Sequence, residues 1–243
     1  MNDILLVFAH PDDETFSLGG TIAALTPRGA HFHLVTATSG GAGRTLGLVP
    51  RRELARTREG ELREATGIVG VASTELLGYA DGRLQDAPLG EITRRIAERI
   101  RTLRPRTVIT FPPDGINRHP DHVAIHRFAH RALRLAANAN GRLPGKIFRP
   151  EQVLYIVAPP GYARAGPQAL LPTHGIDIRA AADRKRQALV AHRTQARSVE
   201  SFVKRFPQAF EIELLHRAEP PAQPPRPWSL AALSLDTSWA GIG

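Results

Sequence analysis

The sequence predicts an α/β protein with one mostly parallel sheet that carries helices on both faces. Two observations lead to this prediction. Short apolar runs alternate with segments of helical periodicity along most of the 243 residues, and polar clusters directly follow two of the runs. Strands of such a sheet are buried on both faces, and its ligands bind beyond the carboxyl ends of the strands. We therefore expect a Rossmann-like domain with its functional residues at strand ends.

The first half of the chain has four predicted strands, each rich in Val, Ile, Leu or Phe, at residues 4–8, 31–37, 74–77 and 107–111. Helical periodicity fills the intervals, at residues 17–25, 52–66 and 89–103. Residues 39–43 form a glycine-rich loop after the second strand, but the spacing of a dinucleotide fingerprint is absent. We expect no nucleotide cofactor.

The second half continues the alternation and then changes character. A helix is predicted over residues 120–136, because Pro120 suits a first-turn position. Strands are expected near 153–157 and 175–178, and a helix over 181–197. Five prolines between positions 220 and 227 exclude a regular helix or a central strand. We expect a domain at 1–216 and an extended tail at 217–243 that packs on it.

Composition limits the kinds of site and the compartment. The chain has no cysteine, so disulfides and thiolate zinc sites are impossible and any metal must be held by histidine and carboxylate. It has neither an apolar stretch near the roughly 20 residues of a membrane span nor a secretory signal pattern at its start. We expect a cytoplasmic protein without a membrane segment. Its oligomeric state, including a homo-oligomer, is left open.

The net charge of +9 raises the alternative of a basic nucleic-acid-binding protein. The basic residues are mostly arginines scattered through helical segments, without a basic tail and with few aromatic residues for base stacking. We therefore expect no nucleic-acid partner. The excess of positive charge would instead favour a small anionic substrate by long-range attraction.

Two polar clusters at strand ends predict one metal-dependent active site. His10, Asp12 and Asp13 follow the first strand, and His119-Pro120-Asp121-His122 follows the strand at 107–111. Catalytic zinc takes three protein ligands and leaves a fourth position to water, whose pKa then falls toward about 7. His10, Asp13 and His122 can supply those three ligands.

The remaining acids and the remaining histidine then have distinct tasks. Asp12 is placed to accept a proton from the water, and His119, oriented by Asp121, can stabilise an oxyanion or protonate a leaving amine. Together these groups predict hydrolysis of an amide-like bond.

Simpler explanations exist for some of these residues. Acidic residues before a helix satisfy its free N–H groups, and Glu14 or Asp121 could serve only in that way. Capping does not require a histidine beside two adjacent acids, however. His126 and His130 follow His122 at helical spacing, and we interpret them as ordinary residues of the helix face.

At this point the sequence resembles the zinc-dependent deacetylases of N-acetylglucosamine conjugates, the PIG-L or LmbE-like family. Residues 9–14 and 119–122 correspond to its two motifs, and supporting similarity extends over further segments at 38–43, 58–61, 77–82 and 185–195. The resemblance implies the same roles: His10, Asp13 and His122 as zinc ligands, Asp12 as base, and His119 with Asp121 as acid or transition-state stabiliser.

The resemblance also implies a substrate-contacting arginine, and the chain differs from some family members at one position. Arg58 resembles the arginine with which the family contacts the sugar or its anionic group. Some members place a tyrosine where this chain has Asn117, and whether another residue takes that role is left open. Residues 43–47 are most similar to the bacillithiol-type branch, which deacetylates N-acetylglucosaminyl malate.

The function predicted from the sequence is therefore removal of an N-acetyl group from an acetylated amino-sugar conjugate. One Zn²⁺ per chain is expected, with Fe²⁺ or another divalent ion as the alternative. A second enzymatic reading is amidase action on a thiol-sugar conjugate at the same site.

Overall fold

The computed structural model describes residues 2–139, 143–159, 161–162 and 170–218. Seven strands are present in these ranges: β1 Asn2–Phe8, β2 Ala30–Thr38, β3 Ser73–Tyr79, β4 Thr107–Thr110, β5 Gln152–Ile156, β6 His174–Asp177 and β7 Ile212–Arg217. The α-helices are α1 Asp13–Leu25, α2 Leu54–Val69, α3 Leu89–Leu103, α4 Gly115–Arg118, α5 Pro120–Ala136, α6 Ala182–Ala191 and α7 Ala196–Arg205. The proline-rich segment 219–243 lies outside the described residues.

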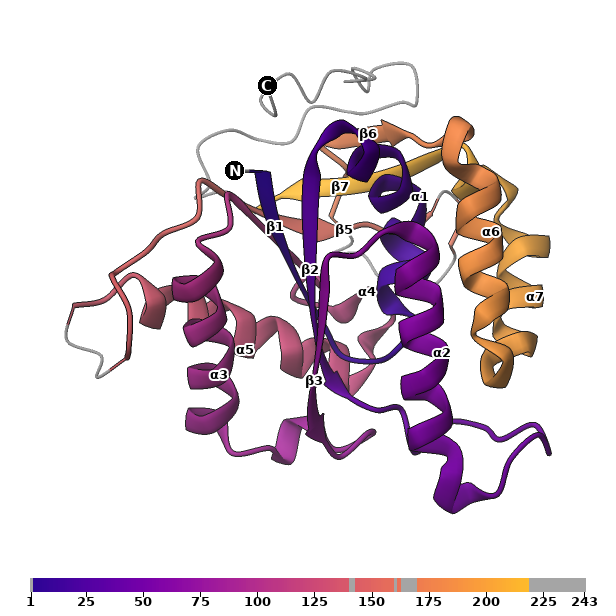
Figure 1. Ribbon diagram of the computed structural model, residues 1–243, viewed down its shortest axis with the longest axis horizontal. Coiled ribbons are helices and arrows are strands. Elements are labelled where there is room, and N and C mark those ends of the chain that lie inside the picture. Colours follow the sequence, from indigo (N-terminus) through magenta and orange to yellow (C-terminus); the bar gives the residue numbers. More distant parts are fainter. Residues whose placement is uncertain (1, 140–142, 160, 163–169, 219–243) are drawn as a thin grey trace.

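The strands form one sheet in the order β3-β2-β1-β4-β5-β7-β6. The five strands from β3 to β5 are parallel, and β7 is antiparallel to both β5 and β6. Figure 1 shows α3 and α5 on one face of the sheet and α1, α2 and α6 on the other. The predicted α/β fold, with a mostly parallel sheet covered on both faces, is confirmed.

The position of the site follows from this strand order. The chain proceeds from β1 outward through β2 to β3, and then returns to place β4 on the other side of β1. The carboxyl ends of β1 and β4 therefore lie side by side at the point where the order reverses, which is where ligands bind in open α/β sheets. The register pairs Val7 of β1 with Thr110 of β4, so both polar clusters emerge at the same edge.

Two predicted helices differ from the structure in their bounds. The first helix begins at Asp13 rather than at residue 17, because the N–H groups of Thr15 and Phe16 both donate to the Asp12 carbonyl. The helix expected over 181–197 is broken at His192, whose φ of −80° and ψ of 63° end α6. A separate helix, α7, follows.

Strand β7 was not predicted, and it supplies one partner of a buried ion pair. Lys185 Nζ on α6 donates to Glu213 Oε1 on β7 at 2.6 Å and to the Ala209 carbonyl at 2.9 Å. Glu213 in turn accepts from the backbone N–H groups of Gly20 and Thr21 on α1, at 2.9 and 2.7 Å. This pair joins α1, α6 and β7 in the interior.

The core lies on both sides of the central strands. Residues 4–8 of β1 are at most 2 % exposed, which agrees with a strand covered on both faces. Among the described helices, none is both long and apolar enough to cross a bilayer.

Candidate active site

Three predicted metal ligands meet at the adjoining ends of β1 and β4. His10 Nδ1 lies 3.2 Å from His122 Nε2, and Asp13 Oδ1 lies 3.5 Å from the same His122 atom. Asp13 Oδ2 accepts hydrogen bonds from the backbone N–H groups of Ala9 and His10, at 3.1 and 2.8 Å, which directs Oδ1 toward His122. One donor atom from each side chain lies within 4.8 Å of the others. Two imidazoles and a carboxylate are a donor set that zinc accepts.

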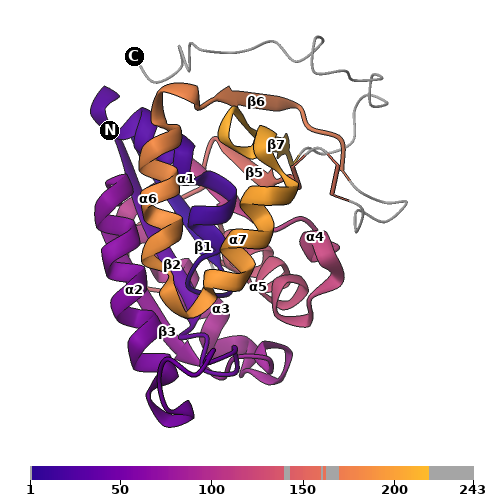
Figure 2. The ribbon, with the colours of Figure 1, turned by 90° about the vertical axis from the view of Figure 1, so that its right-hand side faces the viewer.

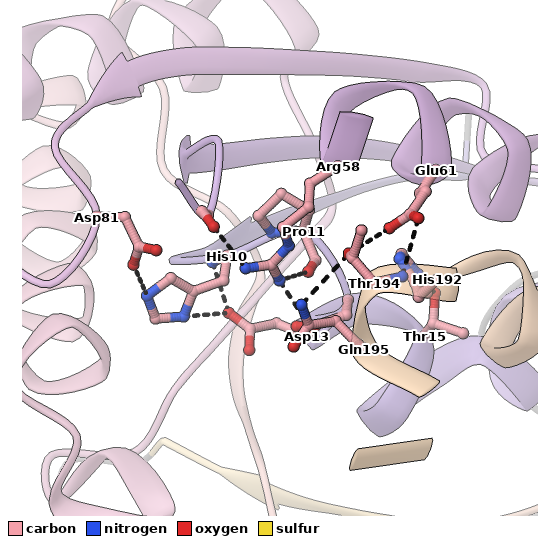
Figure 3. Close-up of polar contacts among 12 residues, drawn as sticks. His10, Pro11, Asp13, Thr15, Arg58, Glu61, Asp81, His192, Thr194 and Gln195 are labelled. Atoms are coloured by element: carbon pink, nitrogen blue, oxygen red, sulfur yellow. Dashed lines mark hydrogen bonds and ion pairs between the residues drawn. The ribbon is translucent and has the colours of Figure 1, made fainter. Parts of the chain in front are cut away.

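The second ring nitrogen of His10 is held by two carboxylates. Nε2 lies 3.0 Å from Asp121 Oδ2 and 3.1 Å from Asp81 Oδ1, and Figure 3 shows the second of these contacts. Burial alone would lower the pKa of His10, but the contacts with Asp121 and Asp81 outweigh it and raise that pKa to about 10. The cluster therefore stabilises positive charge, and Nδ1 of His10 faces His122 and Asp13. Both features fit a divalent cation.

A second possible donor group contains His10, His119 and Asp121. Asp121 is less suited to bind a metal, because both of its oxygens already accept backbone hydrogen bonds. Oδ1 accepts from Leu84 N at 2.9 Å, and Oδ2 accepts from Gly82 N at 2.7 Å in addition to its contact with His10. Asp121 is therefore better placed to orient His10 than to bind an ion.

The loop between β4 and α5 holds His122 in position. Its Nδ1 lies 3.1 Å from the Gly115 carbonyl oxygen, which leaves Nε2 for the centre, and its ring stacks on Phe111 at 3.9 Å. Gly115 has a φ of 64°, and a Cβ there would approach His122 Cβ to 2.7 Å. Ile116 also has a positive φ, 66°, which is rare for a β-branched residue. Strain of this kind concentrates at functional sites.

Asp12, the predicted base, occupies a strained position next to a buried arginine. Its φ is 114°, in the region that favours glycine, and its Oδ2 accepts from Arg58 Nη2 at 3.0 Å. Burial raises the pKa of Asp12 to about 6, against the opposing charge of Arg58. A carboxylate with a pKa near 6 is a better proton acceptor at neutral pH than an ordinary one.

Arg58, for which a substrate contact is predicted, holds the Asp12 turn together in the described structure. It is 4 % exposed, and its guanidinium donates to the Pro11 carbonyl at 2.6 Å and the Gly40 carbonyl at 2.9 Å as well as to Asp12. Figure 3 shows it lying across the turn. A Cβ at Gly40 would come within 2.1 Å of Arg58 Nη1, so position 40 of this loop requires glycine. In the described structure Arg58 is a positioning residue.

The expected contact between Asp121 and His119 is also different. The Asp121 carboxylate lies on His10, whereas only its backbone N–H meets His119, donating to Nδ1 at 3.2 Å. Asp121 therefore contacts His119 through its backbone N–H, and its carboxylate contacts His10. The His119 ring itself lies 4.8 Å from the His122 ring and is partly exposed. Asn117 accepts from His119 N at 3.0 Å and fixes the turn before it.

Sequence reasoning missed two features of this site, namely the role of Asp81 and the pairing of Glu14 with His192. Asp81 was noted only as part of a turn, although it follows the end of β3 just as His10 follows β1, and this parallel was available in the sequence. Glu14 and His192 could not be paired in advance. Glu14 is fully buried, accepts from Asp12 N at 3.3 Å and lies 3.7 Å from His192 Nε2, so it supports the Asp12 turn from behind.

A cleft of about 670 Å³ opens at this end of the sheet. Asp13 and His122 line it, together with residues of α7. Its lining includes aromatic side chains and three arginines: Phe16, Phe111, Tyr162, Phe202, Phe206, Arg44, Arg197 and Arg205. The volume is sufficient for a small molecule such as a sugar conjugate.

Comparison with known proteins places this site in a family. Residues 5–133 match the PIG-L family, described as GlcNAc-PI de-N-acetylase. A 1D-myo-inositol 2-acetamido-2-deoxy-alpha-D-glucopyranoside deacetylase of Rhodococcus jostii is 33 % identical over 236 residues, covering 79 % of this chain and 81 % of its own length. The chain belongs to the PIG-L family.

Two further comparisons bear on the branch of the family to which this PIG-L protein is similar and on its fold. A probable N-acetyl-alpha-D-glucosaminyl L-malate deacetylase of Bacillus anthracis is 40 % identical over 133 residues, which cover 54 % of this chain and 58 % of that protein. The crystal structure of a conserved protein from Thermus thermophilus matches with a TM-score of 0.71 at 29 % identity, covering 94 % of this chain and 100 % of the other. The resemblance to this family is confirmed, and the protein is an N-deacetylase of conjugates of N-acetylglucosamine.

Proposed function

We propose that this PIG-L protein uses Zn²⁺, held by His10, Asp13 and His122, to remove the acetyl group from an N-acetylglucosaminyl conjugate. The observation that carries the proposal is the cluster itself. Three carboxylates surround two adjacent imidazoles, and the excess negative charge is balanced by a proton on His10 or by a cation. When bound, zinc would supply a Lewis acid and lower the pKa of a coordinated water.

Asp12 is the proposed general base. Its pKa near 6 leaves it ionised at neutral pH but able to take a proton from the attacking water. Arg58 and Glu14 hold the turn on which it lies, so the carboxylate is fixed before substrate arrives. Such fixing reduces the reorganisation needed during the reaction.

His119 is the proposed oxyanion stabiliser and proton donor to the leaving amine. Burial lowers the pKa of His119, and the charges of His122 and His10 lower it further. Its Nδ1 accepts from Asp121 N, so Nε2 is the nitrogen that can act on substrate. Asp121 acts through His10, as an orienting carboxylate.

For the finer substrate we propose N-acetylglucosaminyl malate. The similarity of residues 43–47 to the bacillithiol-type branch and the 40 % identity to the Bacillus anthracis relative support it. The inositol conjugate named for the Rhodococcus jostii relative is the competing substrate, since that match covers more of the chain.

Release of free amine from a panel of conjugates tests the proposed function. The panel holds N-acetylglucosaminyl malate, the N-acetylglucosaminyl inositol, N-acetylglucosamine itself and a mercapturate-type thiol-sugar amide. We expect zinc-dependent release from at least one acetylated glucosaminide. Cleavage of the thiol-sugar amide alone would favour the amidase reading, and cleavage of none by zinc-reconstituted protein would refute the proposal.

A further inference from the structure

We infer that the active-site cleft contains a binding site for an anionic group, formed by Arg44, Arg197 and Arg205. The ligand would be an N-acetylglucosamine conjugate whose second moiety carries a carboxylate or a phosphate. This inference rests on the proposed function, because the same cleft must hold the acetylated sugar. It adds the residues that would select one class of conjugate over another.

Helix α7 presents two of the arginines along one face. Arg197, Ser201 and Arg205 are spaced four residues apart, so they share a side of the helix, and all three line the cleft. Phe202 and Phe206 pack beneath, and Phe202 meets Phe16 of α1 at 5.0 Å between ring centroids. The aromatic contacts fix α7 as a wall, and Figure 2 shows it between α6 and α4.

The three arginines have no acidic partner within the part of the chain that the structure describes. No carboxylate oxygen lies within the 4.0 Å of an ion pair from their guanidinium groups. Some exposed arginines elsewhere on the surface do have an acidic partner, as Arg193 has Glu64 at 2.9 Å and Arg106 has Glu151 at 2.7 Å. Among the described residues that line the cleft, Asp13 is the only acid.

Guanidinium groups without an acidic partner around a concave site favour a carboxylate or phosphate, and Arg205 lies 5.4 Å from the Phe206 ring centroid. Their planar N–H donors match both anions in a two-point arrangement, and these charge-assisted hydrogen bonds are stronger than neutral ones. Arg197 and Arg205 are eight residues apart, or about 12 Å along the helix axis.

Binding of matched conjugates tests the site separately from catalysis. The protein is reconstituted with zinc and carries Asp12→Asn, so that substrate is held without turnover. Calorimetry compares N-acetylglucosaminyl malate with its dimethyl ester, and N-acetylglucosaminyl inositol with its inositol phosphate form. The first pair tests a carboxylate and the second a phosphate.

We expect an anionic member to bind more tightly than its neutral counterpart, with an affinity that falls as salt rises. Arg197→Gln or Arg205→Gln should weaken that member about tenfold and leave the neutral one unchanged, since a hydrogen bond to a charged group is lost. Lys204→Gln removes a charge from the same helix outside the cleft and should have no effect. Preference for malate or for phosphate identifies the anion.

Equal affinity for charged and neutral members, or equal effects of the Arg197, Arg205 and Lys204 variants, would overturn the inference. Turnover by protein with native Asp12 then separates the two proposals. Anion-selective binding without deacetylation would retain the arginine site and reject the proposed function. Deacetylation of both members of a pair at the same kcat/KM would retain the proposed function and reject the arginine site.

Discussion

The buried Lys185–Glu213 pair and the charged cluster around His10, both within the described residues, differ in how completely their groups are satisfied. Lys185 and Glu213 form one cation and one anion in direct contact; Lys185 Nζ also donates to the Ala209 carbonyl, and both Glu213 oxygens accept from backbone N–H groups. At the ends of β1 and β4, by contrast, Asp13, Asp81 and Asp121 surround His10 and leave its charge to be set by what binds there.

The difference distinguishes a structural ion pair from a site. A buried pair with matched charge needs no ligand, and its removal is felt as lost stability. A cluster with surplus negative charge, a strained residue at Asp12 and an open cleft is completed by a ligand. Variants of the Lys185–Glu213 pair should therefore change stability, and variants of the cluster at the ends of β1 and β4 should change turnover or zinc binding.

The largest expected effect is on turnover, from Asp12→Asn. Loss of the general base should lower kcat by about 10²- to 10⁴-fold, because the water's proton then lacks an acceptor. The thermal midpoint and the zinc content should remain near those of the parent protein. Steady-state kinetics with the best substrate of the panel measures the change. Asp86→Asn, an exposed acid outside the cleft, is the control, and full activity of Asp12→Asn would remove Asp12 from the role of base.

The next effect is on stability, from Lys185→Met. Glu213 would remain buried without its cation, so the free energy of unfolding should fall by about 3–5 kcal/mol. Chemical denaturation measures it, while zinc content at low temperature should be unchanged. Lys204→Met, which removes an exposed lysine, should cost far less. If Lys185→Met lost zinc and kept its stability, the assignment of stability to the Lys185–Glu213 pair and of zinc binding to the His10 cluster would be wrong.

A smaller effect is expected from Asp81→Asn. The neutral amide would orient His10 less firmly and reduce the negative charge around it, so zinc affinity should fall by about 10- to 100-fold. Competition with a fluorescent chelator measures the affinity. Asp12→Asn provides the comparison, since it should change turnover with little change in zinc affinity. An unchanged affinity in Asp81→Asn would show that Asp121 orients His10 by itself.

The smallest effect concerns a cluster of neutral groups on α5 and β5. Burial lowers the pKa of His130 to about 4, and the charges of His126 and Arg134 act in the same direction. His130 Nε2 lies 2.7 Å from the Tyr155 hydroxyl oxygen, within hydrogen-bond distance. Because the unfolded state binds the proton more readily, its contribution to stability should be present above about pH 6.5 and be lost as the pH falls toward about 4.

The test compares the parent with His130→Gln across this range. The parent should lose more stability between pH 6.5 and pH 4 than His130→Gln does, and His31→Gln should follow the parent. Parallel curves for parent and His130→Gln would show that this histidine is not held neutral by the fold.

The sequence allowed the fold and the centre of the site to be predicted for a physical reason. Buried parallel strands are continuous apolar runs, and the residues that follow them must emerge at one edge of the sheet. His10, Asp13 and His122 could therefore be grouped from their positions alone. Helices α3 and α5 were predicted with the bounds that the structure gives them, because their apolar periodicity is uninterrupted.

Contacts made across the fold could not be predicted in this way. The pairing of Arg58 with Asp12, and of Glu14 with His192, depends on how helices and loops pack rather than on spacing. The helix break at His192 also has a tertiary cause. Its buried ring meets Thr15, and the turn lets Thr194 donate to Glu61 at 2.9 Å.

Metal stoichiometry tests the central proposal most directly. Parent, Asp12→Asn and Asp13→Ala proteins are stripped with a chelator, reconstituted with zinc, dialysed and measured by elemental analysis. The account predicts about one zinc per chain in the parent and in Asp12→Asn, and far less in Asp13→Ala. Folded parent protein that retains no zinc, or Asp13→Ala that retains as much as the parent, would contradict it.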